Sequence, residues 1–150
     1  MFKKILSLAV ILSSFAAVPS LAQNKVNNPL IRNCYTFGGE FWIYNLNQAQ
    51  ELPSCRFEGM AVGALDFFLY TSRDTVTSIR ALSIARNPVP TGEVCGVYQG
   101  QLVLGVDDQG EQHRFCMFKD KSFISERALK LGKFAPEVAP LVKGLEAALQ

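Results

Sequence analysis

The sequence predicts an α+β fold made of two disulfide-stapled units, each a β-hairpin followed by a helix. The two units are expected to pack as a pseudo-dimer, together with a C-terminal amphipathic helix. The first observation is the spacing of the four cysteines, because a shift of 61 residues, from 34 to 95, places Cys34 on Cys95 and Cys55 on Cys116. The second is that strand-like alternation lies between the paired cysteines, and the third is that helical spacing of apolar residues follows each pair.

Residues 1–22 are predicted to be a signal peptide and not part of the fold. A basic start with Lys3 and Lys4 precedes an apolar run, and Ser20-Leu21-Ala22 supplies small residues before a cleavage site. The run is short for a membrane span, which favours export over an N-terminal anchor helix. We therefore expect one exported domain over residues 23–150, either periplasmic or secreted.

The charge of the mature chain argues against several kinds of partner. Without Lys3 and Lys4, the 15 basic residues fall to 13 and equal the 13 acidic ones. Since no basic run remains, nucleic acid is not an expected partner. No later apolar stretch is long enough to cross a membrane, so no span is expected after signal removal.

Four cysteines in an exported chain indicate two disulfides, for which three connectivities are possible. A zinc site is the weaker interpretation, because there is no C-x-x-C pair and only one histidine. The hairpin in each unit brings its two cysteines together at the open end, which favours Cys34–Cys55 and Cys95–Cys116. We predict no metal site and no cofactor.

Other positions also agree under the 61-residue shift. The repeats are expected to cover about residues 28–72 and 89–133. The further matches are Pro29 with Pro90, Phe37 with Tyr98, Gly39 with Gly100, and Phe57 with Phe118. The paired glycines are expected to permit a special backbone angle where the chain enters a strand.

The elements of the second unit are the easier ones to predict. Alternation predicts a strand over Gln101–Val106, and Asp107–Gly110 has turn residues with a glycine available for positive φ. A return strand over Glu111–Phe118 completes the hairpin. A helix should follow, with Asp120 or Ser122 as its N-cap and with a glycine, Gly132, at its end.

The first unit has a less regular pattern. The segment "EFWIY" from Glu40 is its outgoing strand, "NLNQAQELP" is a long loop, and Gly59–Tyr70 is an apolar helix. Between the units, Asp74–Arg86 fits a helix capped by its aspartate, although its threonine-rich start also suits a strand. Residues 136–150 carry one apolar stripe and are predicted to form the C-terminal helix.

Few residues suggest catalysis. His113, the single histidine, alternates with strand residues and is expected at the surface, and Asp107 and Asp108 are explained by the turn. The cysteines offer no thiolate if they are paired, so no catalytic residue is predicted and the protein is not expected to be an enzyme. The alternative is a small envelope hydrolase that uses Asp107, Asp108 or His113.

Aromatic residues supply the candidate binding patch, namely Trp42, Tyr44, Phe67 and Tyr70. They are either covered by the neighbouring unit or exposed for recognition. Together with the neutral charge and the disulfides, they indicate an exported, non-enzymatic binding module of unknown ligand. A hydrolase inhibitor or an envelope interaction protein fits this description, with a protein or an envelope component as its partner.

The segment "NPLIRNCYTFGGEFWI", followed by "CRFEG", resembles a family of small exported bacterial domains of unknown function. That family has the pattern N-P, Cys, G-G and Cys, and its members are often labelled haemolysins. The second unit resembles a degenerate copy through Pro90, Cys95, Gly100 and Cys116. Family members commonly carry D-G-S and a further cysteine after the second one, and this chain has neither in either unit. The resemblance implies no catalytic residues.

Overall fold

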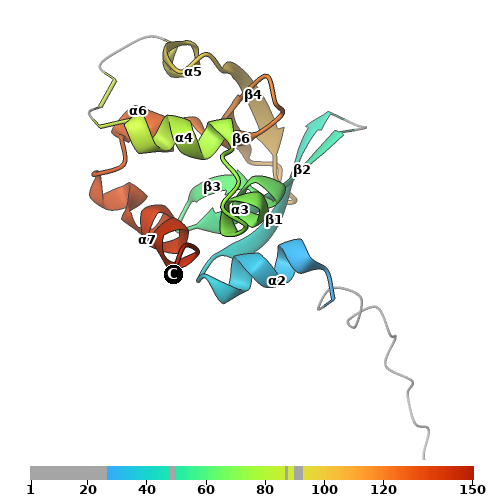
Figure 1. The fold of residues 1–150 in the computed structure, drawn as a ribbon. Helices are drawn as coiled ribbons and strands as arrows, with labels where there is room; N and C mark the ends of the chain where they lie inside the picture. The colour runs from blue at the N-terminus through green and yellow to red at the C-terminus, as the bar shows by residue number, and fades with distance from the viewer. Residues whose placement is uncertain (1–26, 48–49, 87, 90–92) are drawn as a thin grey trace, which may run out of the picture.

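The structure is a computed structural model that describes residues 27–47, 50–86, 88–89 and 93–150. The predicted signal peptide lies outside these residues. The α+β class and the two disulfides are confirmed. Figure 1 shows the strands at the centre with helices around them, α5 above, α2 below and α4, α6 and α7 on the left, while the β1–β2 hairpin projects to the right. No helix among the described residues is long and apolar enough to cross a membrane.

The first half of the chain begins with a helix that was not predicted. Its elements are α2 (Pro29–Thr36), β1 (Glu40–Asn47), β2 (Gln50–Phe57), β3 (Met60–Gly63) and α3 (Ala64–Thr71). Helix α2 starts in the standard way, because Asn28 accepts a hydrogen bond from the Leu30 N–H at 2.9 Å and Pro29 occupies the first turn. Strands β1 and β2 pair antiparallel, with Phe41 opposite Cys55.

The second half repeats this order of helix, three strands and helix. Its elements are α5 (Val94–Val97), β4 (Gln101–Val106), β5 (Gln112–Met117), β6 (Phe123–Ser125) and α6 (Glu126–Leu131). Helix α4 (Thr77–Ile84) lies between the halves in sequence, and the 3₁₀ turn η1 (Pro136–Val138) and α7 (Ala139–Ala147) follow the second half. The predicted β4–β5 hairpin is confirmed, including the positive φ of Gly110.

The six strands close into a barrel in the order β1-β2-β3-β6-β5-β4, a closure that the sequence did not predict. Two strand pairs join the halves. Asn45 lies opposite Val106, and Val62 lies opposite Ile124. Each closing contact therefore joins residues 61 or 62 positions apart, close to the shift that superimposes the cysteines.

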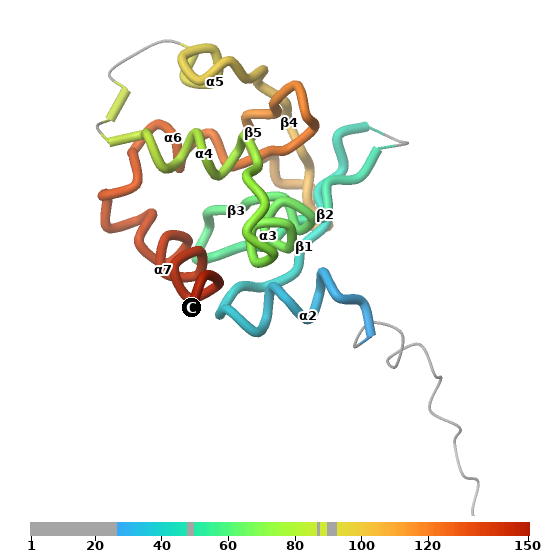
Figure 2. Tube along the Cα trace, in the orientation of Figure 1, coloured from blue at the N-terminus to red at the C-terminus, as the bar shows by residue number. Residues whose placement is uncertain are grey.

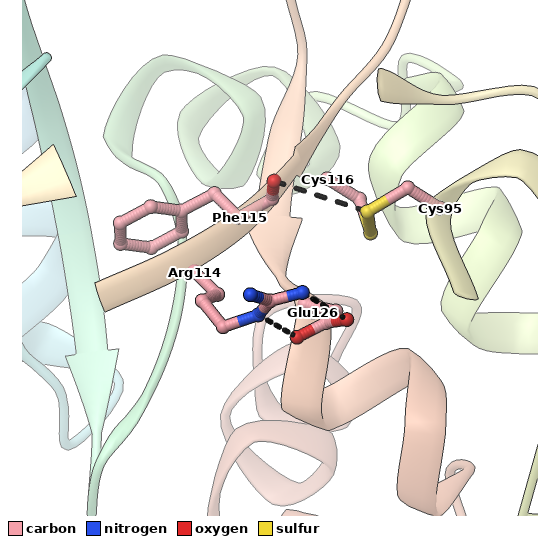
Figure 3. The surroundings of a disulfide bond; sticks show 5 residues. All are labelled: Cys95, Arg114, Phe115, Cys116 and Glu126. Carbon is pink, nitrogen blue, oxygen red and sulfur yellow. Dashed lines mark hydrogen bonds and ion pairs between the residues drawn. A yellow bond between two sulfur atoms is a disulfide. The ribbon is translucent and has the colours of Figure 1, made fainter. Parts of the chain in front are cut away.

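Each disulfide ties the short helix before a hairpin to the hairpin's second strand. Cys34 of α2 bonds Cys55 with Cα atoms 5.3 Å apart, and Cys95 of α5 bonds Cys116 with Cα atoms 5.1 Å apart. Figure 3 shows the second bridge beside the strand β5. In the same region Arg114 and Glu126 form a two-pronged ion pair, with N–O distances of 2.7 and 3.2 Å, that joins β5 to α6 (Figure 3).

Two hydrophobic cores stabilise the fold. The larger core lies between the outer face of the strands and the helices, and it contains both disulfides with Phe57, Phe67 and Leu141. The helices α4 and α6, which run close together in Figure 2, contribute to it. The smaller core fills the barrel interior and includes Tyr44 and Phe115.

Two predicted helices differ from the structure. The first part of the predicted helix Gly59–Tyr70 is strand β3, because these residues pair with β2. The helix predicted over Asp74–Arg86 is shorter, and Asp74 is not its cap. Instead, the first N–H groups of α4 are bound by Asp120 at 3.2 Å and Ser122 at 3.0 Å. These two side chains were predicted to cap the helix that follows them, and they cap a helix that precedes them.

Glycine is required at positions 39 and 100 for a reason that differs from the predicted one. Neither Gly39 nor Gly100 has a positive φ. A Cβ at Gly39 would lie 2.8 Å from the ring of Phe57, and a Cβ at Gly100 would lie 3.1 Å from the ring of Phe118. In both halves, glycine is therefore needed because the aromatic ring after the second cysteine packs against the backbone.

Candidate functional site

The four residues of the predicted aromatic patch do not form one exposed surface. Tyr44 is 2% exposed and Phe67 is fully buried, while Trp42 and Tyr70 are half-buried. Tyr44 and Trp42 belong to the barrel interior, whereas Phe67 and Tyr70 belong to the core beneath the helices. The prediction of a single recognition patch is therefore wrong, because alternate residues of β1 point into the barrel and α3 packs on the opposite face of the sheet.

Phe67 and Tyr70 lie away from the barrel interior. The ring of Phe67 packs edge-on against that of Phe37, with centroids 5.8 Å apart. Tyr70 lines a separate groove of about 570 Å³, whose rim carries Arg73 and Arg80. Burial raises the pKa of the Tyr70 hydroxyl, and the nearby Glu146 carboxylate adds to this effect.

The structure instead brings Trp42 and Tyr44 together with the residues considered for catalysis. The ring of Tyr44 lies 6.4 Å from that of Trp42 and 4.8 Å from that of His113, measured between centroids. His113 Nε2 lies 2.8 Å from an oxygen of Asp107. These four side chains come from β1, β5 and the β4–β5 turn, and they meet at one end of the barrel, which we call the barrel mouth.

Asp107 has a structural reason for its position. One carboxylate oxygen accepts hydrogen bonds from the N–H groups of Gln109 at 3.0 Å and Glu111 at 2.9 Å, which closes the turn as predicted. The other oxygen bonds His113, and this bond, with those two N–H groups, lowers the pKa of the Asp107 carboxyl. The carboxylate therefore holds both the turn and the imidazole in place.

Trp42 is held by its neighbours on the strand side of the barrel mouth. Its indole N–H donates to Glu40 at 3.0 Å, and the guanidinium of Arg56 lies over its ring at 4.3 Å from the centroid. Burial raises the pKa of the neighbouring Tyr44 hydroxyl, although the positive charge of Arg56 opposes this shift. The indole is thus fixed by Glu40, Arg56 and the stacked ring of Tyr44.

A group of metal-ligating side chains is also found here. Among the described residues, the ligand atoms of Asp107, Glu111 and His113 all lie within 4.8 Å of one another. The Asp107 oxygen that faces this group is already bonded to the imidazole, and its other oxygen serves the turn. Asp108 does not belong to this group and lines a neighbouring groove.

That groove, of about 510 Å³, runs along the start of β1 and is called here the β1-edge groove. Its walls are Ile31 and Tyr35 of α2, the consecutive β1 residues Glu40 to Ile43, and Asp108 of the β4–β5 turn. Tyr35 is 60% exposed and Ile43 is 41% exposed, so two large apolar side chains of this groove are open to solvent.

The sequence analysis missed the α2 wall of this groove. No helix was predicted over residues 29–36, so the aromatic side chain of Tyr35 was not considered. Two signals were present, an asparagine followed by a proline at a possible helix start, and Ile31 and Tyr35 at i and i+4. Of the predicted patch, only Trp42 lines the groove, and Asp108 from the hydrolase alternative lies across from it.

Comparisons of the chain with protein-family models, curated protein sequences and solved structures found no match. The resemblance to the exported haemolysin-labelled domains stays a prediction from the sequence.

Proposed function

We propose that this chain is an exported, non-enzymatic binding module that engages a protein or an envelope component at the β1-edge groove. One observation carries the proposal. Tyr35, Trp42 and Ile43 present apolar surface to a single groove on a rigid scaffold, and neither hydrophobic core of the protein covers them completely. Partly exposed aromatic and aliphatic side chains around a depression are typical of interaction sites.

The scaffold is proposed to be two copies of one unit packed as a pseudo-dimer. The same order of helix, three strands and helix in each half supports this interpretation, as does the separation of 21 residues in both disulfides. The closing pair Asn45–Val106 joins equivalent positions and Val62–Ile124 joins positions one residue from equivalence, as expected around an approximate two-fold axis. Such a scaffold would hold a site on one half fixed relative to the other.

Export is proposed from the predicted signal peptide. Two disulfides among the described residues agree with an oxidising compartment, either the periplasm or the medium. Within such a compartment, an inhibitor of a hydrolase or a factor that binds other envelope proteins would need no catalytic group of its own.

The test compares capture of envelope and secreted proteins by the immobilised mature chain and by three variants, Tyr35→Ala, Trp42→Ala and Phe134→Ala. Tyr35→Ala removes an exposed aromatic ring from the groove, and Phe134→Ala removes one that is 72% exposed and lies outside the groove's lining. We expect a specific partner to be lost with Tyr35→Ala and Trp42→Ala and kept with Phe134→Ala. Capture that is equal in all variants would refute a site at this groove.

A small hydrolase is the second candidate, because His113 and Asp107 lie 2.8 Å apart, as a general base and its orienting carboxylate would. Asp108 lies outside this pair. Hydrolysis of ester or glycoside substrates by the wild type that falls at least 100-fold with His113→Gln would favour the enzyme over the binding module. Unchanged background rates would remove this candidate.

A further inference from the structure

The β1-edge groove is formed by consecutive residues of a strand. Glu40, Phe41, Trp42 and Ile43 all line it, although neighbouring side chains of a strand point to opposite faces of the sheet. A single depression can contact both faces only where it runs along the edge of the strand. The main chain of the first half of β1 therefore borders the groove.

The strand pairing explains why this edge is open. Strands β1 and β4 pair antiparallel with Asn45 opposite Val106. Continuing this register places Ile43 opposite Asp108, which is in the β4–β5 turn and not in a strand. Within the described part of the chain, β1 pairs with β2 on one side over residues 40–47, but with β4 on the other side only at Asn45.

Side chains beside this edge provide apolar contacts of the kind that strand addition uses. Ile31 and Tyr35 lie one helical turn apart on α2, and Ile43 lies on the outer face of β1. An added strand would place every second side chain on the same face as Ile43 and Phe41, and cross-strand apolar pairs of this kind stabilise a sheet. Main-chain hydrogen bonds then give affinity, and the flanking side chains select the sequence.

The charges that line the groove favour a ligand of positive charge. Glu40 and Asp108, both exposed, are the charged residues that line it, and no lysine or arginine does so. Arg56 is stacked over Trp42, and Asp107 and Glu111 add further carboxylates at the barrel mouth. A segment that carries lysine or arginine at alternate positions complements this arrangement.

We propose that the β1-edge groove binds an extended, positively charged segment of a partner polypeptide, which adds as a strand to the edge of β1 between α2 and Asp108. This inference rests on the proposed binding function and specifies the chemistry of its partner. The groove combines α2 and β1 of the first half with Asp108 of the second, and the equivalent positions on β4 differ in chemistry. At the equivalent positions of β4, Gln101 replaces Glu40, and the exposed Leu104 replaces Ile43 without a flanking carboxylate.

The experiment uses three blocked hexapeptides and the full mature chain. The first alternates lysine and valine, the second alternates glutamate and valine, and the third is the lysine peptide with N-methyl groups on alternate amides. Trp42 is the single tryptophan of the chain, so its fluorescence reports binding at the groove directly. We expect the lysine peptide to bind, at least tenfold more tightly than either of the others, and to weaken as salt is raised.

Charge variants test the role of the two carboxylates. Glu40→Gln keeps an acceptor for the Trp42 indole, and Asp108→Asn alters a side chain at the far wall. Each is expected to weaken the lysine peptide about two- to fivefold, as for exposed ion pairs, and the pair together about tenfold. Asp74→Asn, an exposed carboxylate outside this groove, is the matched control and should leave the affinity unchanged.

The outcomes distinguish failure of the strand-addition proposal from failure of the binding function. Equal affinity for the lysine and glutamate peptides would refute charge selection, and equal affinity for the N-methylated peptide would refute strand addition. Either result leaves the binding function intact if partner capture still depends on Tyr35. Carboxylates also guard strand edges against self-association. Absence of peptide binding, together with dimerisation of the Glu40→Gln, Asp108→Asn double variant, would overturn the proposal in favour of that role.

Discussion

Asp66 is the buried carboxyl group with the clearest consequence for stability. It lies in the first turn of α3 and is 6% exposed. One of its oxygens accepts the Phe123 N–H at 2.8 Å and the Ser78 hydroxyl at 3.2 Å, so it links α3 to β6 and α4. Burial raises its pKa from 3.8 to about 6, with a smaller contribution from Asp120, although both hydrogen bonds favour the ionised form.

The magnitude follows from linkage. Because the native pKa exceeds the unfolded one, the native state holds the proton more tightly, and the stabilisation is fully present below pH 3.8 and lost as the pH rises through 6. At about 1.4 kcal/mol per pKa unit, ionised Asp66 makes the fold less stable by about 3 kcal/mol. Between pH 7 and pH 5 this group alone should add about 1.3 kcal/mol to the free energy of unfolding.

The assay is urea unfolding of the disulfide-intact chain at pH 5, 6 and 7, for the wild type and for Asp66→Asn. The asparagine keeps an oxygen for the Phe123 N–H but does not titrate. We expect the variant to be more stable at pH 7, by up to about 3 kcal/mol, and to lack the gain between pH 7 and pH 5. Other titrating groups cancel in the difference between the two proteins.

Two results would refute this reasoning. If wild type and Asp66→Asn show the same change in unfolding free energy with pH, Asp66 does not titrate in this range. If the variant is less stable at every pH, the hydrogen bonds to the ionised carboxylate outweigh its burial. Asp74→Asn is the control, since Asp74 is exposed and its removal should leave the pH dependence unchanged.

Three further predictions concern the scaffold. Replacing Cys95 and Cys116 together by alanine removes a bridge across 21 residues and should lower the free energy of unfolding by about 3 kcal/mol, measured in denaturant without added reductant. Gly144→Ala places a Cβ against the ring of Phe57 and should cost about 1–3 kcal/mol, seen as a lower melting temperature; an unchanged value would mean that the ring moves freely. Ser122→Ala removes an acceptor at the start of α4 and should cost about 1 kcal/mol, with faster amide exchange in that turn; exchange that is unchanged would contradict this cap.

The second hairpin could be predicted from the sequence because its signals are local. Alternation over Gln101–Val106 and the turn glycine Gly110 specify both strands without reference to the rest of the chain. The first hairpin was harder to predict. The segment from Asn45 to Pro53 is polar and its pattern predicts a loop, yet Asn45 and Glu51 are exposed residues that pair across β1 and β2, and polarity at exposed positions carries no information about strand or loop.

The third strand of each half could not be predicted locally. All four residues of β3, from Met60 to Gly63, are buried, and so are the three of β6 from Phe123. A short strand that is buried on both faces shows no alternation of apolar and polar residues, so its sequence resembles the first turn of the helix that follows it. Only pairing with distant strands, such as Val62 with Ile124, distinguishes the two. Closure of the barrel depends on such pairs.

The candidate site also depends on pairing between distant strands. Trp42, Tyr44, Asp107 and His113 each stood out in the sequence, but they were assigned to different roles. They meet because β1 and β4 pair at Asn45, a contact between residues far apart in the chain. The groove also needs α2, so its composition could not be derived from β1 alone.

The barrel interior shows how the two halves differ in spite of their similar order of elements. Under the 61-residue shift Tyr44 corresponds to Gly105, and Phe115 corresponds to Ser54. A Cβ at Gly105 would lie 2.9 Å from the Tyr44 Cβ and 3.0 Å from the Phe115 ring, so the large side chains occupy space that the glycine leaves open. At these positions each half supplies one large residue, Tyr44 or Phe115, and one small residue, Ser54 or Gly105, and their places are exchanged between the halves. The halves are therefore complementary and not interchangeable. The first half can keep Tyr44 on β1 because Gly105 of the second half leaves room for it.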